Sequence, residues 1–101
     1  SRIMIKGEKR FIDSLAFSND YTYNLQKAAE EFTELSLVLQ QYILKPQKVD
    51  IQEIIDEIGD CTIRLRILKQ LFDKDRINWR ITDKVISYID YKDNKKYIGR
   101  I

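Results

Sequence analysis

The fold is decided by residues 21–71, which read YTYNLQKAAEEFTELSLVLQQYILKPQKVDIQEIIDEIGDCTIRLRILKQL. Apolar side chains recur there every three or four residues, the spacing that places them on one face of an α-helix. Pro46 interrupts the pattern, because proline has no amide hydrogen and disfavours helical backbone at the residue before it. The stretch therefore predicts two long helices, over residues 21–44 and from about 51 to 73, joined by a turn at 45–49.

Polar residues mark where these two helices begin. Asn19 or Asp20 can cap the first helix, because a short side chain that carries an oxygen can accept from the unpaired amides of a first turn. Asp50, followed three residues later by Glu53, resembles a capping box and predicts the start of the second helix.

Shorter helices are expected on either side of this pair. One covers residues 7–17, and a last one covers residues 81–91, with Asn78 or Thr82 as its cap. The sequence has no strand-like alternation. We therefore expect an all-α fold, a helical bundle built on two long antiparallel helices with short flanking helices.

Length and composition bound the class of protein. The chain has 101 residues, one Pro and three Gly, so we expect a single domain over residues 1–101. Cys61 is the only cysteine, which excludes an internal disulfide. The sequence has neither a signal-peptide pattern nor an apolar run long enough to span a bilayer, so we expect a cytoplasmic protein with no membrane contact.

The two long helices have more apolar surface than such a short chain can cover. Each would be roughly 35 Å long at about 1.5 Å per residue. The second also carries Ile55, Ile63 and Ile67 on a second side, which needs a partner surface. We therefore expect a homodimer or a homotetramer.

Charge is divided between the middle and the end of the chain. Residues 28–60 hold eight acids against two bases, a net charge of −6, whereas residues 76–101 hold seven bases against three acids, a net charge of +4. An acidic region can hold cations and a basic region can hold anions, as a metal-bound phosphate ligand requires. The alternative is that both regions are ordinary solvated helix faces.

Two pairs of carboxylates interrupt the apolar faces of the long helices. Glu31 pairs with Glu34, and Glu57 with Asp60, each three residues apart. On a wheel at about 100° per residue, the first acid of each pair lies near 240°, inside the apolar arc, and the second near 180°, at its margin. If the helices pack through these faces, the four carboxylates converge at the edge of the core.

Converging carboxylates repel one another unless a cation lies among them. Carboxylate oxygens favour a hard ion, so Mg²⁺, or alternatively Mn²⁺, is the expected cofactor. The sequence contains no His, which argues against di-iron Glu-x-x-His centres, most zinc sites and His-based catalytic triads.

Ordinary structural roles compete with this interpretation. Glu31 could pair with Lys27, and Asp60 with Arg64, each four residues apart. Gly59 favours the metal site, because a mid-helix glycine costs about 1 kcal/mol relative to alanine and suits a position where something approaches the backbone.

The carboxylates also carry a resemblance to a known family. The pattern Glu30-Glu31-Phe-Thr-Glu34, followed about two dozen residues later by Glu57-Ile-Gly-Asp60, resembles the EExxE and ExxD motifs of the MazG-like, all-alpha nucleoside triphosphate pyrophosphatase superfamily. The apolar residues that frame both motifs are similar as well. The resemblance covers roughly residues 25–71, and it extends less well to the end of the chain.

The resemblance implies a Mg²⁺-dependent hydrolase that converts a nucleoside triphosphate to the monophosphate and pyrophosphate, in the service of nucleotide-pool housekeeping. It implies Glu31, Glu34, Glu57 and Asp60 as metal ligands. Glu30 and Glu34 would orient or deprotonate the attacking water, because no His is present to do so.

Substrate contacts are implied for the end of the chain. The family commonly ends in a basic, Asn-containing stretch before a Tyr, and residues 91–97, YKDNKKY, are similar but differ in spacing and lack the proline that follows. Lys92, Asn94, Lys96 and Tyr97 would contact phosphate or sugar, with a solvated basic end as the alternative. Trp79 could stack on a base, although large aromatics mostly serve cores and interfaces.

A second function class stays open. The chain could be a non-enzymatic helical module that binds protein or nucleic acid through its basic end, although the leading interpretation does not involve nucleic acid. A family member that binds nucleotides without hydrolysing them is a third alternative.

Overall fold

The computed structural model describes residues 5–93. Within that range the chain forms four α-helices and one turn of 3₁₀ helix, and no strand. It divides into two compact units, one up to Leu71 and one from Phe72 onward. The all-α class and the helical bundle are confirmed for these residues, whereas a single domain over residues 1–101 stays a prediction.

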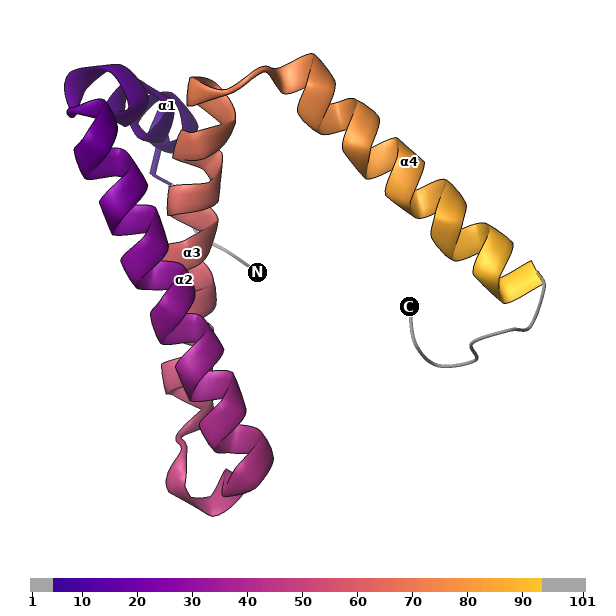
Figure 1. Cartoon of the computed structure of the whole chain (residues 1–101). Coiled ribbons are helices and arrows are strands. Elements are labelled where there is room, and N and C mark those ends of the chain that lie inside the picture. The colour runs from indigo at the N-terminus through magenta and orange to yellow at the C-terminus, as the bar shows by residue number, and fades with distance from the viewer. Residues whose placement is uncertain (1–4, 94–101) are drawn as a thin grey trace. The chain divides into compact units, whose positions relative to one another are not determined.

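The first unit is built on α2 (Tyr21–Leu44) and α3 (Ile51–Leu71), which pack against each other. Between them, Pro46 begins the 3₁₀ turn η1 (Pro46–Lys48), and the chain reverses direction there (Figure 1). The Asp50 carboxylate accepts from the Gln52 amide at 2.9 Å, which satisfies one of the unpaired donors of the first turn of α3. The reversal places the middle of α3 beside the middle of α2.

The helix α1 (Glu8–Ser18) contacts both long helices near the start of α2. Asn24, which is 1% exposed, donates through Nδ2 to the Leu15 and Ala16 carbonyls at 3.2 and 3.4 Å. These carbonyls belong to the last turn of α1, where that of Leu15 also accepts from the Asn19 amide at 3.3 Å. The side chain of Asn24 therefore caps α1 and ties it to α2.

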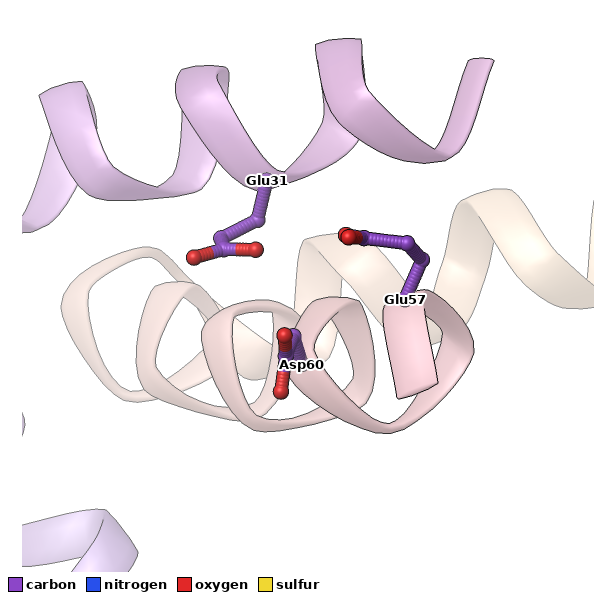
Figure 2. Close-up of side chains that lie close together, drawn as sticks. All are labelled: Glu31, Glu57 and Asp60. Atoms are coloured by element: carbon purple, nitrogen blue, oxygen red, sulfur yellow. The ribbon is translucent and has the colours of Figure 1, made fainter. Parts of the chain in front are cut away.

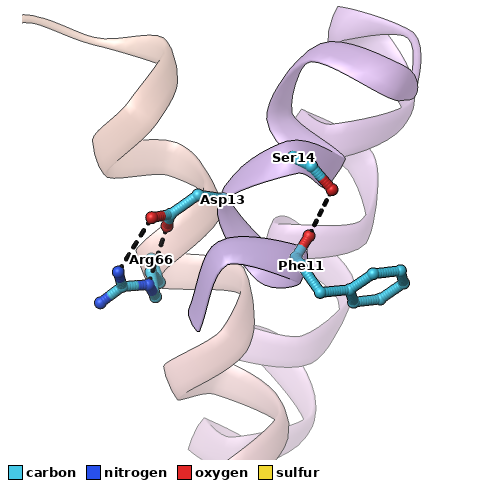
Figure 3. Close-up of polar contacts among 4 residues, drawn as sticks. All are labelled: Phe11, Asp13, Ser14 and Arg66. Carbon is cyan, nitrogen blue, oxygen red and sulfur yellow. Dashed lines mark hydrogen bonds and ion pairs between the residues drawn. The ribbon is translucent and has the colours of Figure 1, made fainter. Parts of the chain in front are cut away.

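An ion pair connects α1 to α3. The Arg66 guanidinium donates to Asp13 through Nη2 at 2.9 Å, and its Nε lies 2.8 Å from the other carboxylate oxygen (Figure 3). Two parallel contacts of this kind fix the orientation of both side chains. Within α1, Ser14 Oγ donates to the Phe11 carbonyl at 2.6 Å, as the same figure shows. The pair holds α1 against the C-terminal half of α3.

Small and β-branched side chains fill the space between the helices. The buried apolar residues of the described range are Ala16, Ala28, Val38, Val49, Cys61 and Ile67. Ile67 is 1% exposed, so the flanking helix covers part of the second apolar side that the sequence predicts for α3. Ile55 and Ile63 stay 53% and 38% exposed, and this part of the apolar side faces outward.

The second unit contains α4 (Lys74–Asp93), which is longer than the sequence predicts. The prediction that the last helix begins at residue 81 is wrong, because the Asp73 carboxylate accepts from the amides of Asp75 and Arg76 at 3.0 and 3.1 Å. This cap starts the helix directly after α3 ends. Asn78 and Thr82 lie inside α4, so neither is its cap.

Within the described residues, none of the helices combines the length and the apolar character that crossing a membrane requires.

Candidate metal centre

Three of the four expected ligands come together between α2 and α3. Carboxylate oxygens of Glu31, Glu57 and Asp60 all lie within 4.8 Å of one another. Figure 2 shows the Glu31 side chain extending from α2 toward α3, and the Glu57 side chain turning toward it. The two carboxylates of the ExxD motif lie one helical turn apart on α3, so both can reach the single carboxylate from α2.

The spacing is close to what one small cation requires. Oxygens at about 2.1 Å from one octahedral Mg²⁺ lie about 3.0 Å apart in neighbouring positions and about 4.2 Å apart in opposite ones, so carboxylate oxygens within 4.8 Å of one another need to approach by up to about 1.8 Å. Glu31 and Glu57 are partly buried, whereas Asp60 is exposed. A cation at this cluster would thus lie between protein and solvent.

Two carboxylate oxygens of the cluster are buried and unbonded. Oε2 of Glu31 and Oε2 of Glu57 are covered by protein and have no hydrogen-bond partner among residues 5–93. A covered carboxylate oxygen normally has a donor or a cation beside it, because desolvation disfavours its charge. An all-oxygen donor set of this kind fits Mg²⁺ or Mn²⁺.

The electrostatics of the cluster are those of mutual repulsion. Burial raises the pKa of the Glu31 carboxyl above its ordinary value of 4.5, and the charges of Glu34 and Asp60 raise it further, while Lys27 opposes them. Burial also raises the pKa of Glu57, followed by the charges of Glu34, Glu31 and Asp60. The folded chain therefore holds these acids together at a cost in free energy that a bound cation would remove.

Glu34 belongs to the neighbourhood but not to the group of three. Its side chain is exposed, and its charge and its hydrogen bonding raise the pKa values of both Glu31 and Glu57. Its assignment as a metal ligand stays a prediction. Its exposure gives its carboxylate access to water.

Glu30 lies on the solvent side of α2. Its carboxylate pairs with Lys27 at 3.1 Å, and its side chain is 60% exposed. The alternative pairing of Lys27 with Glu31 is therefore not the one that the structure has. The contact leaves the Glu31 carboxylate free to lie between the helices.

Arg64 does not pair with Asp60 either. Within residues 5–93, Arg64 takes part in no ion pair, and its Nη1 is buried without a hydrogen-bond partner. It lies four residues after Asp60 and seven after Glu57, which places it on the same face of α3. Both structural alternatives for the cluster acids are thus absent from the described residues.

Cys61 is the residue that sequence reasoning missed. It is one of the buried residues of α3, and its Sγ donates to the Glu31 carbonyl at 3.1 Å. Burial raises the pKa of the thiol, and the acids around it, Glu31 and Glu57 foremost, raise it further, which keeps the proton on sulfur. The sequence shows that Cys61 is next to Asp60. It does not show the hydrogen bond to Glu31, because that bond depends on the register between the two helices.

Gly59 faces open space. A Cβ atom at this position would have no neighbour within 4 Å, counting the described parts of the chain. Gly59 and Asp60 line a groove of about 1290 Å³ between the start of α1 and α3, together with Phe11, Ile55 and Ile63. No part of the described chain requires the glycine, so its role stays a prediction.

The residues expected to bind substrate lie in the second unit or outside the described residues. Trp79 lies in α4 and is 75% exposed, in a shallow pocket with Asp75, Asn78 and Thr82. Lys92 lies in the last turn of α4 and is exposed. Asn94, Lys96 and Tyr97 lie outside the described residues, so their roles stay predictions.

Compared with protein-family models, with curated proteins and with solved structures, the chain matches none of them. The resemblance to the MazG-like superfamily therefore continues to rest on the motif residues themselves.

Proposed function

We propose that this protein is a Mg²⁺-dependent nucleoside triphosphate pyrophosphohydrolase, which converts an NTP or a dNTP to the monophosphate and pyrophosphate. One observation carries the proposal: carboxylate oxygens of Glu31, Glu57 and Asp60 lie within 4.8 Å of one another. These residues belong to the two motifs that resemble the family. Two of the oxygens are buried and unbonded among the described residues, which supports a cation as their partner.

The residues divide the chemistry among them. Bound at the cluster, Mg²⁺ would neutralise charge on phosphate oxygens and lower the pKa of the water that attacks phosphorus. Glu31, Glu57 and Asp60 would hold the cation. Glu34, exposed beside them, would accept the proton of the attacking water, while Glu30 would orient that water from the outer side of α2.

Arg64 offers a positive charge on the same face of α3. Its unbonded Nη1 would donate to a phosphate oxygen, which satisfies a buried N–H group that the described residues leave without an acceptor. The combination of carboxylates and a guanidinium matches a substrate that consists of a cation and a polyphosphate.

The test is release of pyrophosphate. The full chain is incubated with each of the common NTPs and dNTPs in the presence of Mg²⁺, and pyrophosphate is quantified. We expect at least one nucleotide to be hydrolysed, and we expect Glu57→Gln to lower kcat/KM by about 100-fold or more, because it removes one charged ligand.

Glu53→Gln is the matched control. Glu53 lies on the same helix, one turn before Glu57, and outside the cluster, so its activity should stay within about twofold of the original. Hydrolysis of no nucleotide by a folded sample, or equal loss in both variants, contradicts the proposal. In that case a helical interaction module becomes the better interpretation, and nucleic-acid binding that weakens with salt would test it.

We also propose that the α2–α3 pair is an antiparallel hairpin that assembles into a homodimer or a homotetramer. Phe11, Ile55 and Ile63 are 65%, 53% and 38% exposed around one groove, which is more apolar surface than a small monomer usually leaves open. Light scattering coupled to size exclusion measures the mass directly. A monomer at micromolar concentration contradicts this assembly.

A further inference from the structure

We propose that Cys61 is a positioning residue for the metal centre, because its thiol holds α3 in the register that brings Glu57 and Asp60 opposite Glu31. The inference rests on the metal site of the proposed function. It concerns how the ligands are held, and it assigns Cys61 no contact with the metal or the substrate.

The contact that carries the inference joins the two helices at the cluster itself. Cys61 Sγ lies 3.1 Å from the main-chain carbonyl oxygen of Glu31, and the Cys61 side chain is 6% exposed. A helical carbonyl oxygen has a second lone pair beside the one that its own helix uses, so the thiol can donate without disrupting α2. The thiol thus joins α3 directly to the backbone of α2.

One side chain thereby connects all three candidate ligands. Cys61 follows Asp60 directly, lies one turn after Glu57, and is hydrogen-bonded to the backbone of Glu31. A slip of α3 by one residue along α2 would displace its two carboxylates by about 1.5 Å. That displacement is of the same size as the approach that a shared Mg²⁺ already requires of these oxygens, so the register determines whether the ligands can reach one cation.

Two substitutions separate the hydrogen bond from the volume of the side chain. Cys61→Ala and Cys61→Ser both remove the sulfur, but the serine hydroxyl can still donate to the Glu31 carbonyl. The probe is Mn²⁺ alone, titrated into the full chain and followed by calorimetry. We expect the Kd of Cys61→Ala to rise by about tenfold, the scale of losses when a group that orients a ligand is removed, and that of Cys61→Ser to rise by less than about threefold.

Ile67→Val is the control for general weakening of the core. Ile67 is 1% exposed on the same helix, and its apolar side chain forms no hydrogen bond. The Ile67→Val variant should therefore have a lower Tm but an unchanged Kd for Mn²⁺. Equal affinities in Cys61→Ala and Cys61→Ser, an unchanged affinity in Cys61→Ala, or an equal loss in Ile67→Val would each overturn the inference.

The result is distinguishable from that of the proposed function. A chain that binds Mn²⁺ with the expected order of affinities but hydrolyses no nucleotide upholds the role of Cys61 and contradicts the pyrophosphohydrolase. If the original chain hydrolyses nucleotides but Cys61→Ala and Cys61→Ser bind Mn²⁺ with equal affinity, the result upholds the pyrophosphohydrolase and contradicts the role of Cys61. Absence of Mn²⁺ binding by the original chain overturns the inference, because there is then no metal site to position.

Discussion

Two contacts between helices hold carboxylates under partial cover, and they differ in the source of the compensating positive charge. Between α1 and α3, Asp13 faces the Arg66 guanidinium at 2.8 and 2.9 Å. Between α2 and α3, Glu31 and Glu57 face other acids, and within residues 5–93 neither forms an ion pair. The first contact has its compensating charge within the chain, whereas the second has no ion-pair partner among residues 5–93.

Stability and ligand binding are assigned to different halves of α3. The half of the helix that contacts α1 is held by a charge pair of its own, so the cluster half can carry repelling acids without loss of the fold. A ligand that binds only the folded state then recovers the free energy that repulsion removes. The two contacts should therefore respond differently to added cations.

The largest expected effect is stabilisation by Mg²⁺. At a concentration 100-fold above its Kd, a ligand of the folded state adds about 2.7 kcal/mol, which for a chain of this size corresponds to a rise in Tm of about 10 °C or more. Thermal melting with Mg²⁺ and with chelator, at matched ionic strength, measures the shift. Glu57→Gln should lose most of it. A midpoint that Mg²⁺ leaves unchanged contradicts a metal site at the cluster.

A smaller effect is expected at the contact between α1 and α3. Arg66→Met removes the cation and leaves Asp13 without its partner, at a cost of about 1 kcal/mol, because both side chains keep contact with solvent. Urea unfolding measures this loss. The rise in Tm with Mg²⁺ should be the same in this variant as in the original chain. If Arg66→Met abolished the response, the two contacts would be one coupled unit and not two independent ones.

The smallest effect is a dependence of stability on pH in the absence of divalent cations. The pKa values of Glu31 and Glu57 are raised above 4.5, so between that value and the raised ones the folded chain binds more protons than the unfolded chain. The free energy of unfolding must therefore fall as pH rises through this window, and the repulsion is absent below it. Urea unfolding at a series of pH values from 4 upward measures the slope. We expect the change in the free energy of unfolding to be smaller than the two effects above, because solvent screens the partly exposed carboxylates. The double variant Glu31→Gln, Glu57→Gln should show a flatter profile, and an equally steep one would mean that other groups cause it.

Much of the fold could be predicted from periodicity and caps. The range of α2 agrees with the prediction at both ends, and Asp50 caps α3 as its position before an apolar run indicates. The start of α4 was predicted wrongly, because Asp73 was read as the end of one helix rather than as the cap of the next. An aspartate between two helices can be the last residue of the first helix or the cap of the second, and the sequence pattern alone does not distinguish these roles.

The site was predictable in part for a similar reason. The wheel positions of Glu31 and Glu57 follow from spacing within one helix, and the structure brings both acids together with Asp60. The bond from Cys61 to the Glu31 carbonyl depends on the register between two helices, which spacing within either helix does not determine. The pairing of Lys27 with Glu30 instead of Glu31 likewise depends on tertiary packing, because Glu31 is partly buried between the helices whereas Glu30 is exposed.

The empty space above Gly59 offers a point of attachment for a spectroscopic reporter. Since a Cβ at this position meets nothing within 4 Å of the described chain, a cysteine there could carry a fluorine-labelled group without displacing any described residue of its own chain. The label would lie one residue from Asp60, where paramagnetic Mn²⁺ broadens a nearby resonance. Arrival of the ion could then be followed by magnetic resonance in solution, free of any enzymatic readout, in a chain whose other thiol is replaced by serine.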